Sequence, residues 1–218
     1  MEEFSTAKGG VDGLHVLYER PEGTQGIIDI VAVHGMGGHC VNSWTHQATK
    51  CFWLRDLLPV KMPQARIITF QYDTPRLFGQ TAYGVPDHAG ALLKALRDKR
   101  DEESTDPIVF IGHSLGGIII KKAIELANTD DVFRDNIAKA AQGIVFFGTP
   151  HRGSAVASFL IVKMMTSLPG WSGTKFLPLL EINSNGLSEI TEDFLPFAHK
   201  YALVTFYEQH NFPWLKYR

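Results

Sequence analysis

The sequence has few of the features that mark several protein classes. Among its 218 residues only Cys40 and Cys51 are cysteines, and they form no C-x-x-C pair. A disulfide scaffold is therefore excluded, and the sparse cysteine content favours a reduced, intracellular protein. Charge of one sign is also lacking, because 21 Lys and Arg face 23 Asp and Glu, for a net charge of −2. Nucleic-acid binding needs a clustered basic face, so we expect no nucleic-acid partner.

Long apolar runs are absent as well. The longest, at 27–33, is interrupted by Asp29 and is far shorter than the about 20 residues needed to cross a bilayer. The first residues, Met1 to Ser5, are acidic and fit neither a secretory signal nor a transit peptide. We therefore expect a soluble chain, with peripheral attachment to a membrane left open.

Short apolar runs rich in β-branched residues alternate with longer helix-like stretches. Strands that are apolar throughout are covered on both faces, and strand–helix alternation implies parallel pairing with right-handed crossovers. We therefore expect one α/β domain over residues 1–218, a three-layer sandwich around a mostly parallel sheet. The predicted strands are 14–18, 27–33, 66–72, 108–111, 143–147 and 202–207, and the predicted helices are 53–58 (stopped by Pro59), 87–100, 115–127 and 131–141.

The alternation breaks down between residues 153 and 196. Prolines, glycines and the run Asn183-Ser184-Asn185-Gly186 interrupt the pattern there. In a doubly wound sheet, ligands bind at the carboxyl ends of the strands. Two interpretations of this segment stay open, namely a cap or lid over that edge of the sheet and a pair of solvent-facing helices.

The main chemical signal is the run Gly112-His113-Ser114-Leu115-Gly116, which has the pattern G-x-S-x-G. It lies between the strand at 108–111 and the helix at 115–127. Ser114 is therefore predicted to stand on a sharp strand-to-helix turn, the nucleophile elbow. Glycines leave room at such a strained turn, and the serine projects at the positive end of the following helix. The alternative is a strand–helix turn without chemistry.

A second run, His34-Gly35-Met36-Gly37-Gly38, directly follows the strand at 27–33. Acyl transfer needs two backbone N–H groups aimed at the developing oxyanion. We expect them to come from Leu115, the residue after the nucleophile, and from Met36. His34, Gly35 and His113 are expected to line the same site, with His34 as a packed loop residue rather than a base.

The competing interpretation of this second run is a phosphate cradle. The dinucleotide pattern G-x-G-x-x-G fails because Cys40 stands where the third glycine is needed, and no G-x-x-x-x-G-K-[ST] occurs. We therefore expect no cofactor and no metal site.

A third polar run, FGTPHRGS at 147–154, lies at the end of the strand at 143–147. It again places polar groups at the carboxyl edge of the sheet. His151 is predicted either to line the site or to be buried and bonded to the backbone.

Four segments taken together resemble a known family. They are VHGMGG at 33–38, WLRDLLP at 53–59, FIGHSLGG at 110–117 and FGTPHRGS at 147–154. They resemble the lipase-like serine esterase family, which includes serine-active-site-containing proteins and the hydrolase-like modules at the N-termini of fungal NACHT and ankyrin-repeat proteins. The similarity to GPI inositol deacylases is more distant. The resemblance covers most of 27–154, and also 205–208.

This resemblance implies an α/β-hydrolase fold, a serine nucleophile and ester or acyl-lipid substrates. It also implies association with mitochondrial or endoplasmic reticulum membranes, with the cytoplasm as the alternative. Further C-terminal domains in a longer product are a second implication.

A serine needs a neighbouring base, and in this fold the order along the chain is Ser, then Asp or Glu, then His. Glu208, at the tip of the strand at 202–207, is the best positional candidate for the acid. A solvated loop carboxylate is the alternative for Glu208, and Asp193 is a weaker candidate because it precedes the strand.

The histidine is harder to place. His199 precedes the last strand and is expected at the amino edge of the sheet, His151 comes before the candidate acid, and His210 follows it by two residues. Related family members carry another strand and then a histidine-bearing loop, where this sequence stops at Arg218. We therefore expect a C-terminally incomplete domain whose last strand is an exposed apolar edge. Truncation or loss of activity is favoured over substitution by His151 or His210.

Two functional hypotheses follow. The first is a serine hydrolase acting on ester or acyl-lipid substrates through Ser114 and a backbone oxyanion hole. The second is a catalytically impaired or truncated hydrolase-like interaction module, supported by the lack of a well-placed histidine. The sequence alone does not decide whether the chain is an active enzyme.

Overall fold

The computed structural model of the chain describes residues 12–24, 26–73, 84–101, 104–151 and 177–207. Its centre is a six-stranded sheet with the strand order β1-β3-β2-β4-β5-β6. β1 pairs antiparallel with β3 at one edge, and all other neighbours are parallel, which confirms the predicted mostly parallel sheet. The strands are β1 (Gly13–Tyr18), β2 (Ile28–Val33), β3 (Ala65–Gln71), β4 (Ile108–His113), β5 (Ala141–Phe147) and β6 (Ala202–Phe206).

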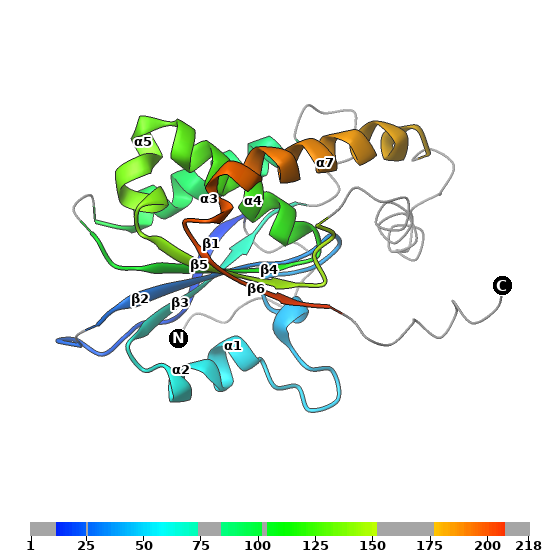
Figure 1. Cartoon of the computed structure of the whole chain (residues 1–218). Helices are drawn as coiled ribbons and strands as arrows, with labels where there is room; N and C mark the ends of the chain where they lie inside the picture. Colours follow the sequence, from blue (N-terminus) through cyan, green and yellow to red (C-terminus); the bar gives the residue numbers. More distant parts are fainter. Residues whose placement is uncertain (1–11, 25, 74–83, 102–103, 152–176, 208–218) are drawn as a thin grey trace.

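Helices cover both faces of this sheet, so the expected three-layer sandwich is confirmed (Figure 1). None of the described helices is both long and apolar enough to cross a membrane. One face carries α3 (Val85–Lys99), α4 (Leu115–Thr129), α5 (Asp131–Phe133), the π-helical turn η3 (Arg134–Ala138) and α7 (Leu177–Ala198), and the other carries α1 (Trp53–Asp56), α2 (Leu58–Lys61) and the 3₁₀ turn η1 (Asn42–Trp44).

The hydrophobic core has two parts, one on each face of the sheet. The larger part packs α3, α4 and the second half of α7 around Phe110, Ile144 and Phe146. The smaller part packs α1 and η1 onto the opposite face through Leu54 and Trp44. The central strands are largely buried on both faces, and this is why apolar residues dominate them in the sequence.

Two helix predictions were wrong in detail. Pro59 does not stop a single helix at 53–58, because α1 ends at Asp56 and Pro59 lies in the first turn of α2. Proline is tolerated there because a first-turn N–H has no intrahelical partner. The helix predicted at 131–141 is instead α5 followed by η3, and Ala141 already belongs to β5.

The segment predicted as irregular, 153–196, is partly helical. α7 continues through Asn183-Ser184-Asn185-Gly186 and Pro196, and it packs on α4 with Ile190 and Phe194 buried. Burial of one apolar face therefore outweighs the weak helix propensity of these residues. Residues 152–176 lie outside the described part of the chain, so a cap over the sheet edge stays a prediction.

β6 forms the second edge of the sheet. Within the described ranges it pairs only with β5. Leu203, Val204, Phe206 and the adjoining Tyr207 are between 43% and 75% exposed, which confirms the predicted exposed apolar edge. Such an edge offers unpaired backbone groups to another chain.

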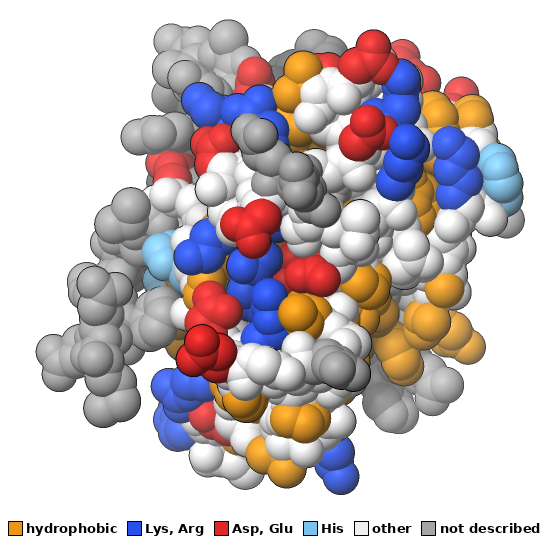
Figure 2. All heavy atoms as spheres, turned by 90° about the vertical axis from the view of Figure 1, so that its left-hand side faces the viewer, with side chains coloured by type: hydrophobic (Ala, Val, Ile, Leu, Met, Phe, Trp, Pro, Cys, Tyr) orange, Lys and Arg blue, Asp and Glu red, His pale blue; other side chains and the backbone are white. Residues whose placement is uncertain are grey.

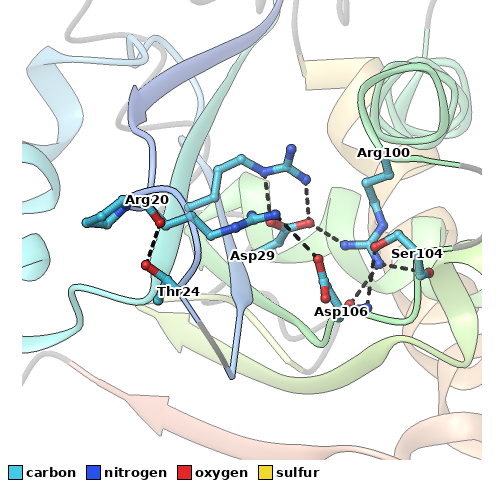
Figure 3. A network of polar contacts seen from close by, with 8 residues as sticks. Arg20, Thr24, Asp29, Arg100, Ser104 and Asp106 are labelled. Carbon is cyan, nitrogen blue, oxygen red and sulfur yellow. Dashed lines mark hydrogen bonds and ion pairs between the residues drawn. The ribbon is translucent and has the colours of Figure 1, made fainter.

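At the amino edge of the sheet, an ionic network surrounds Asp29 (Figure 3). The carboxylate of Asp29 is completely buried and accepts hydrogen bonds from the side chains of Arg66 and Arg100. Arg100 also donates to the backbone carbonyl of Asp106, and Arg20 approaches the Asp106 carboxylate to 3.7 Å. The network thus ties β2, β3 and the loop before β4 together. Seen from outside, this edge carries Lys and Arg side chains interspersed with Asp and Glu (Figure 2).

Candidate active site

Ser114 occupies the sharp turn predicted between β4 and α4. Its backbone angles are φ 50° and ψ −119°, a left-handed conformation that costs free energy for a residue with a Cβ. The turn is held by a hydrogen bond from the Ser114 N–H to the carbonyl of Phe147 (2.8 Å) and by one from the Gly117 N–H to the Ser114 carbonyl (3.1 Å). This is the strand–turn–helix geometry of a nucleophile elbow.

Two glycines allow the backbone to come close around Ser114. A Cβ on Gly116 would lie 2.1 Å from the carbonyl oxygen of Val33, so α4 begins in direct contact with the end of β2. A Cβ on Gly35 would lie 3.0 Å from the Cβ of Ser114. The two glycine-rich runs that are far apart in the sequence therefore meet at the serine.

Two buried amides near Ser114 have no hydrogen-bond acceptor in the described part of the chain. One is the N–H of Leu115, the first residue of α4, and the other is the N–H of Met36. The first N–H groups of a helix have no intrahelical partner. Both amides are thus available to an oxygen atom of a ligand, and the oxyanion-donor roles of Leu115 and Met36 stay a prediction.

His34 is a packed residue of the loop after β2. It is completely buried, its Nδ1 donates to the carbonyl of Gly35 (2.8 Å), and burial lowers the pKa of His34 to about 4. The imidazole is therefore neutral at physiological pH. This agrees with the prediction of a structural rather than a basic role.

His113 and His151 lie at the carboxyl edge of the sheet, as predicted. His113 is the last residue of β4. Its ring packs edge-on against the ring of Trp44, with 6.4 Å between the ring centroids. His151 follows β5, packs edge-on against Phe146 at 4.8 Å between ring centroids, and has its Nε2 3.4 Å from the hydroxyl of Thr205 on β6. His151 thus contacts side chains of β5 and β6, and among the described residues no hydrogen bond joins its ring to the backbone.

Lys121 is a buried lysine that none of the sequence motifs indicates, and it packs on the same Phe146 ring as His151. Lys121 on α4 donates from Nζ to the hydroxyl of Thr191 on α7 (3.0 Å), and Nζ lies 5.8 Å from the ring centroid of Phe146. Burial lowers the pKa of Lys121 to about 8. Burial also lowers the pKa of His151 to about 4, and the positive charge of Lys121 contributes to that decrease. A signal was available, because Lys121 stands four residues after Gly117, on the helix face that packs on the sheet.

The acid and the base are not brought to Ser114 by the described residues. No histidine or carboxylate among them forms a hydrogen bond with the Ser114 hydroxyl. The parallel pairing of β6 with β5 puts His199 at the amino edge, as predicted. Asp193 lies on α7, is half-exposed, and faces Lys122 at 3.8 Å. Glu208 and His210 lie outside the described residues.

The described side chains contain no group of three or more His, Cys, Asp or Glu residues arranged to hold a metal ion.

Comparisons with known proteins identify the family of the chain. Residues 29–181 match the family described as "Putative serine esterase (DUF676)". Protein SERAC1 of Homo sapiens is 26% identical over 209 residues, which cover 86% of this chain and 31% of the relative. Protein SERAC1 of Danio rerio is 24% identical over 225 residues, covering 90% of this chain and 33% of the relative. The chain therefore spans about a third of the length of these curated relatives.

A solved structure shows the fold. The mature form of the Bacillus licheniformis lipase BlEst2 superposes with a TM-score of 0.53 at 16% sequence identity, over 88% of this chain and 70% of the lipase. The α/β-hydrolase fold that the resemblance implied is thereby confirmed. With the family match covering well over half of its residues, the chain belongs to the putative serine esterase (DUF676) family.

Proposed function

We propose that this chain is a serine hydrolase domain that cleaves carboxylic esters with Ser114 as the nucleophile. The observation that carries the proposal is the position of Ser114, on a strained turn beside two buried amides that lack an acceptor among the described residues. A loop without chemistry has no physical reason to hold a serine in a left-handed conformation next to unsatisfied N–H groups.

The chemistry follows from this arrangement. The Ser114 Oγ attacks the ester carbonyl carbon while its proton passes to a base, and the carbonyl oxygen becomes an oxyanion. The N–H groups of Met36 and Leu115 donate to that oxyanion, and the N-terminus of α4 adds a favourable partial positive charge. Collapse of the intermediate expels the alcohol and leaves an acyl-serine, which water then hydrolyses.

The catalytic acid, the substrate class and the cellular location are further parts of this proposal. Glu208, directly after Tyr207, is the candidate acid because it follows the strand beyond the neighbour of the nucleophile strand. The substrate class we propose is an acyl lipid or a similar ester. The family description supports an ester, and the acyl lipid rests on the sequence resemblance alone. Peripheral contact with mitochondrial or endoplasmic reticulum membranes remains a prediction of the sequence resemblance.

One observation favours a second candidate, a hydrolase-like module with little turnover. The Ser114 hydroxyl has no hydrogen bond to a histidine within the described ranges. A serine and an oxyanion hole without a base retain only a small residual acceleration. The protein would then bind an ester or a partner without cleaving it efficiently.

Hydrolysis of p-nitrophenyl esters of increasing acyl length separates the two candidates. We expect turnover that is abolished by Ser114→Ala and unaffected by Ser104→Ala, a serine at the amino edge of the sheet. Turnover that survives Ser114→Ala would overturn the assignment of the nucleophile. Covalent labelling of Ser114 without turnover would favour the impaired module instead.

A further inference from the structure

Tyr72 is a buried residue that the proposed chemistry does not use. It directly follows β3 and is 2% exposed. Its hydroxyl donates to the backbone carbonyl of His34 (2.8 Å). Its ring is stacked on the imidazole of His34, with 4.3 Å between ring centroids and 5° between ring planes. Tyr72 therefore contacts both the backbone and the side chain of His34.

The imidazole of His34 in turn orients a single peptide group. Its Nδ1 donates to the carbonyl of Gly35, which also accepts a hydrogen bond of 3.0 Å from the N–H of Gly38. That carbonyl belongs to the same peptide plane as the N–H of Met36. Because a trans peptide is planar, the C=O and N–H of one unit point in opposite directions. Two hydrogen bonds on the Gly35 carbonyl thus set the direction of the Met36 N–H.

The imidazole has one hydrogen bond, through Nδ1, and its Nε2 is buried without a hydrogen-bond partner among the described residues. The stacked ring of Tyr72 is one of the packing contacts that surround this completely buried ring. On its other side, the Tyr72 ring packs against Phe70 of β3 and His88 of α3, so it is itself fixed by the core.

We propose that Tyr72 is a positioning residue whose hydroxyl, by holding the backbone carbonyl of His34, aims the Met36 N–H at the oxyanion. This inference rests on the proposed function, in which Met36 is an oxyanion donor. Tyr72 touches no substrate and acts only through His34 and the Gly35–Met36 peptide. Removing one oxyanion donor lowers the reaction rate by about 100- to 1,000-fold. A donor N–H that points in the wrong direction should lower the rate by a part of that factor.

The test compares Tyr72→Phe with a matched control, Tyr201→Phe. Each variant removes one buried hydroxyl that forms a hydrogen bond, and Tyr201 bonds Asn128 (2.7 Å) next to the start of β6, at the opposite edge of the sheet. Two quantities are measured in each protein: the second-order rate constant of Ser114 modification by a fluorophosphonate, and the hydrogen-exchange rate of the amides at 35–38. Thermal midpoints of both variants report any general destabilisation.

We expect Tyr72→Phe to slow fluorophosphonate modification by about tenfold or more and to speed exchange at 35–38 by a similar factor. Tyr201→Phe should change neither, although both variants lose similar stability. The result that overturns the inference is an unchanged modification rate or unchanged exchange in Tyr72→Phe, or an equal effect of Tyr201→Phe. If the fluorophosphonate does not modify Ser114 in the wild-type chain, the proposed function is overturned. The hydrogen-exchange rates of the amides at 35–38 then decide by themselves whether Tyr72 orders this loop.

Discussion

Arg66 donates two hydrogen bonds of 2.8 Å to the completely buried carboxylate of Asp29. The pair joins β3 to the start of β2, at the sheet edge opposite Ser114. A buried ion pair contributes little compared with an apolar replacement of both partners, but removing one partner leaves an uncompensated charge. The network is therefore a weak point for single substitutions, independent of the site.

Asp29→Asn is expected to lower the free energy of unfolding by about 3–5 kcal/mol, because Arg66 and Arg100 lose their buried counter-charge. The control is Asp98→Asn, which removes the exposed partner of Arg97 (3.1 Å) and should cost less than about 1 kcal/mol. Chemical denaturation of both variants measures the difference. Equal effects of the two substitutions would contradict the role assigned to this network.

Gly116→Ala tests the close approach of α4 to β2. The new Cβ would meet the Val33 carbonyl oxygen at 2.1 Å, so the helix must shift, and we expect a loss of about 1–3 kcal/mol together with loss of Ser114 reactivity. The matched control is Gly90→Ala in α3, where a Cβ meets nothing within 4 Å. Gly90→Ala should raise stability by about 0.5–1 kcal/mol through its better helix propensity. A tolerated Gly116→Ala with normal Ser114 reactivity would show that the contact does not shape the turn.

Most of this fold could be predicted from the sequence because its signals are local. The strands from β2 to β5 are rich in apolar and β-branched residues, and the turn at Ser114 is specified by its flanking glycines. The path of α7 through Gly186 and Pro196 could not be predicted, because it depends on packing against α4 rather than on propensity.

The candidate site could be proposed in part from the sequence, for the same reason. Ser114, Met36 and Leu115 lie in motifs, whereas the stacking of Tyr72 on His34 joins residues 38 apart in the chain. No local pattern encodes such a contact. Likewise, nothing in the order of residues shows that Thr191 of α7 receives the hydrogen bond of Lys121.

Lys121→Met tests the buried ammonium and has a defined pH dependence. Burial lowers the pKa of Lys121 from 10.5 to about 8, so the unfolded chain binds more protons between these values and the destabilising effect of Lys121 is complete below pH 8. Lys121→Met should therefore raise the free energy of unfolding by about 1–3 kcal/mol at pH 7. The gain should shrink as the pH rises from 8 towards 10.5.

The control for this prediction is Lys122→Met, since Lys122 forms an ion pair with Glu125 (2.6 Å) on the same helix. It should show no such gain. Nuclear magnetic resonance titration should also show a higher pKa of His151 in Lys121→Met, because a nearby positive charge has been removed. A stability gain that is independent of pH, or an unchanged His151 titration, would contradict the electrostatic account.

The most direct measurement is the site of covalent attachment of a fluorophosphonate, determined by mass spectrometry of the peptide that contains residues 112–117. The account predicts one phosphonyl group on Ser114, absent from Ser114→Ala and retained in Ser104→Ala. A wild-type chain that is folded but takes up no phosphonyl group at Ser114, or one modified equally in Ser114→Ala, would contradict it.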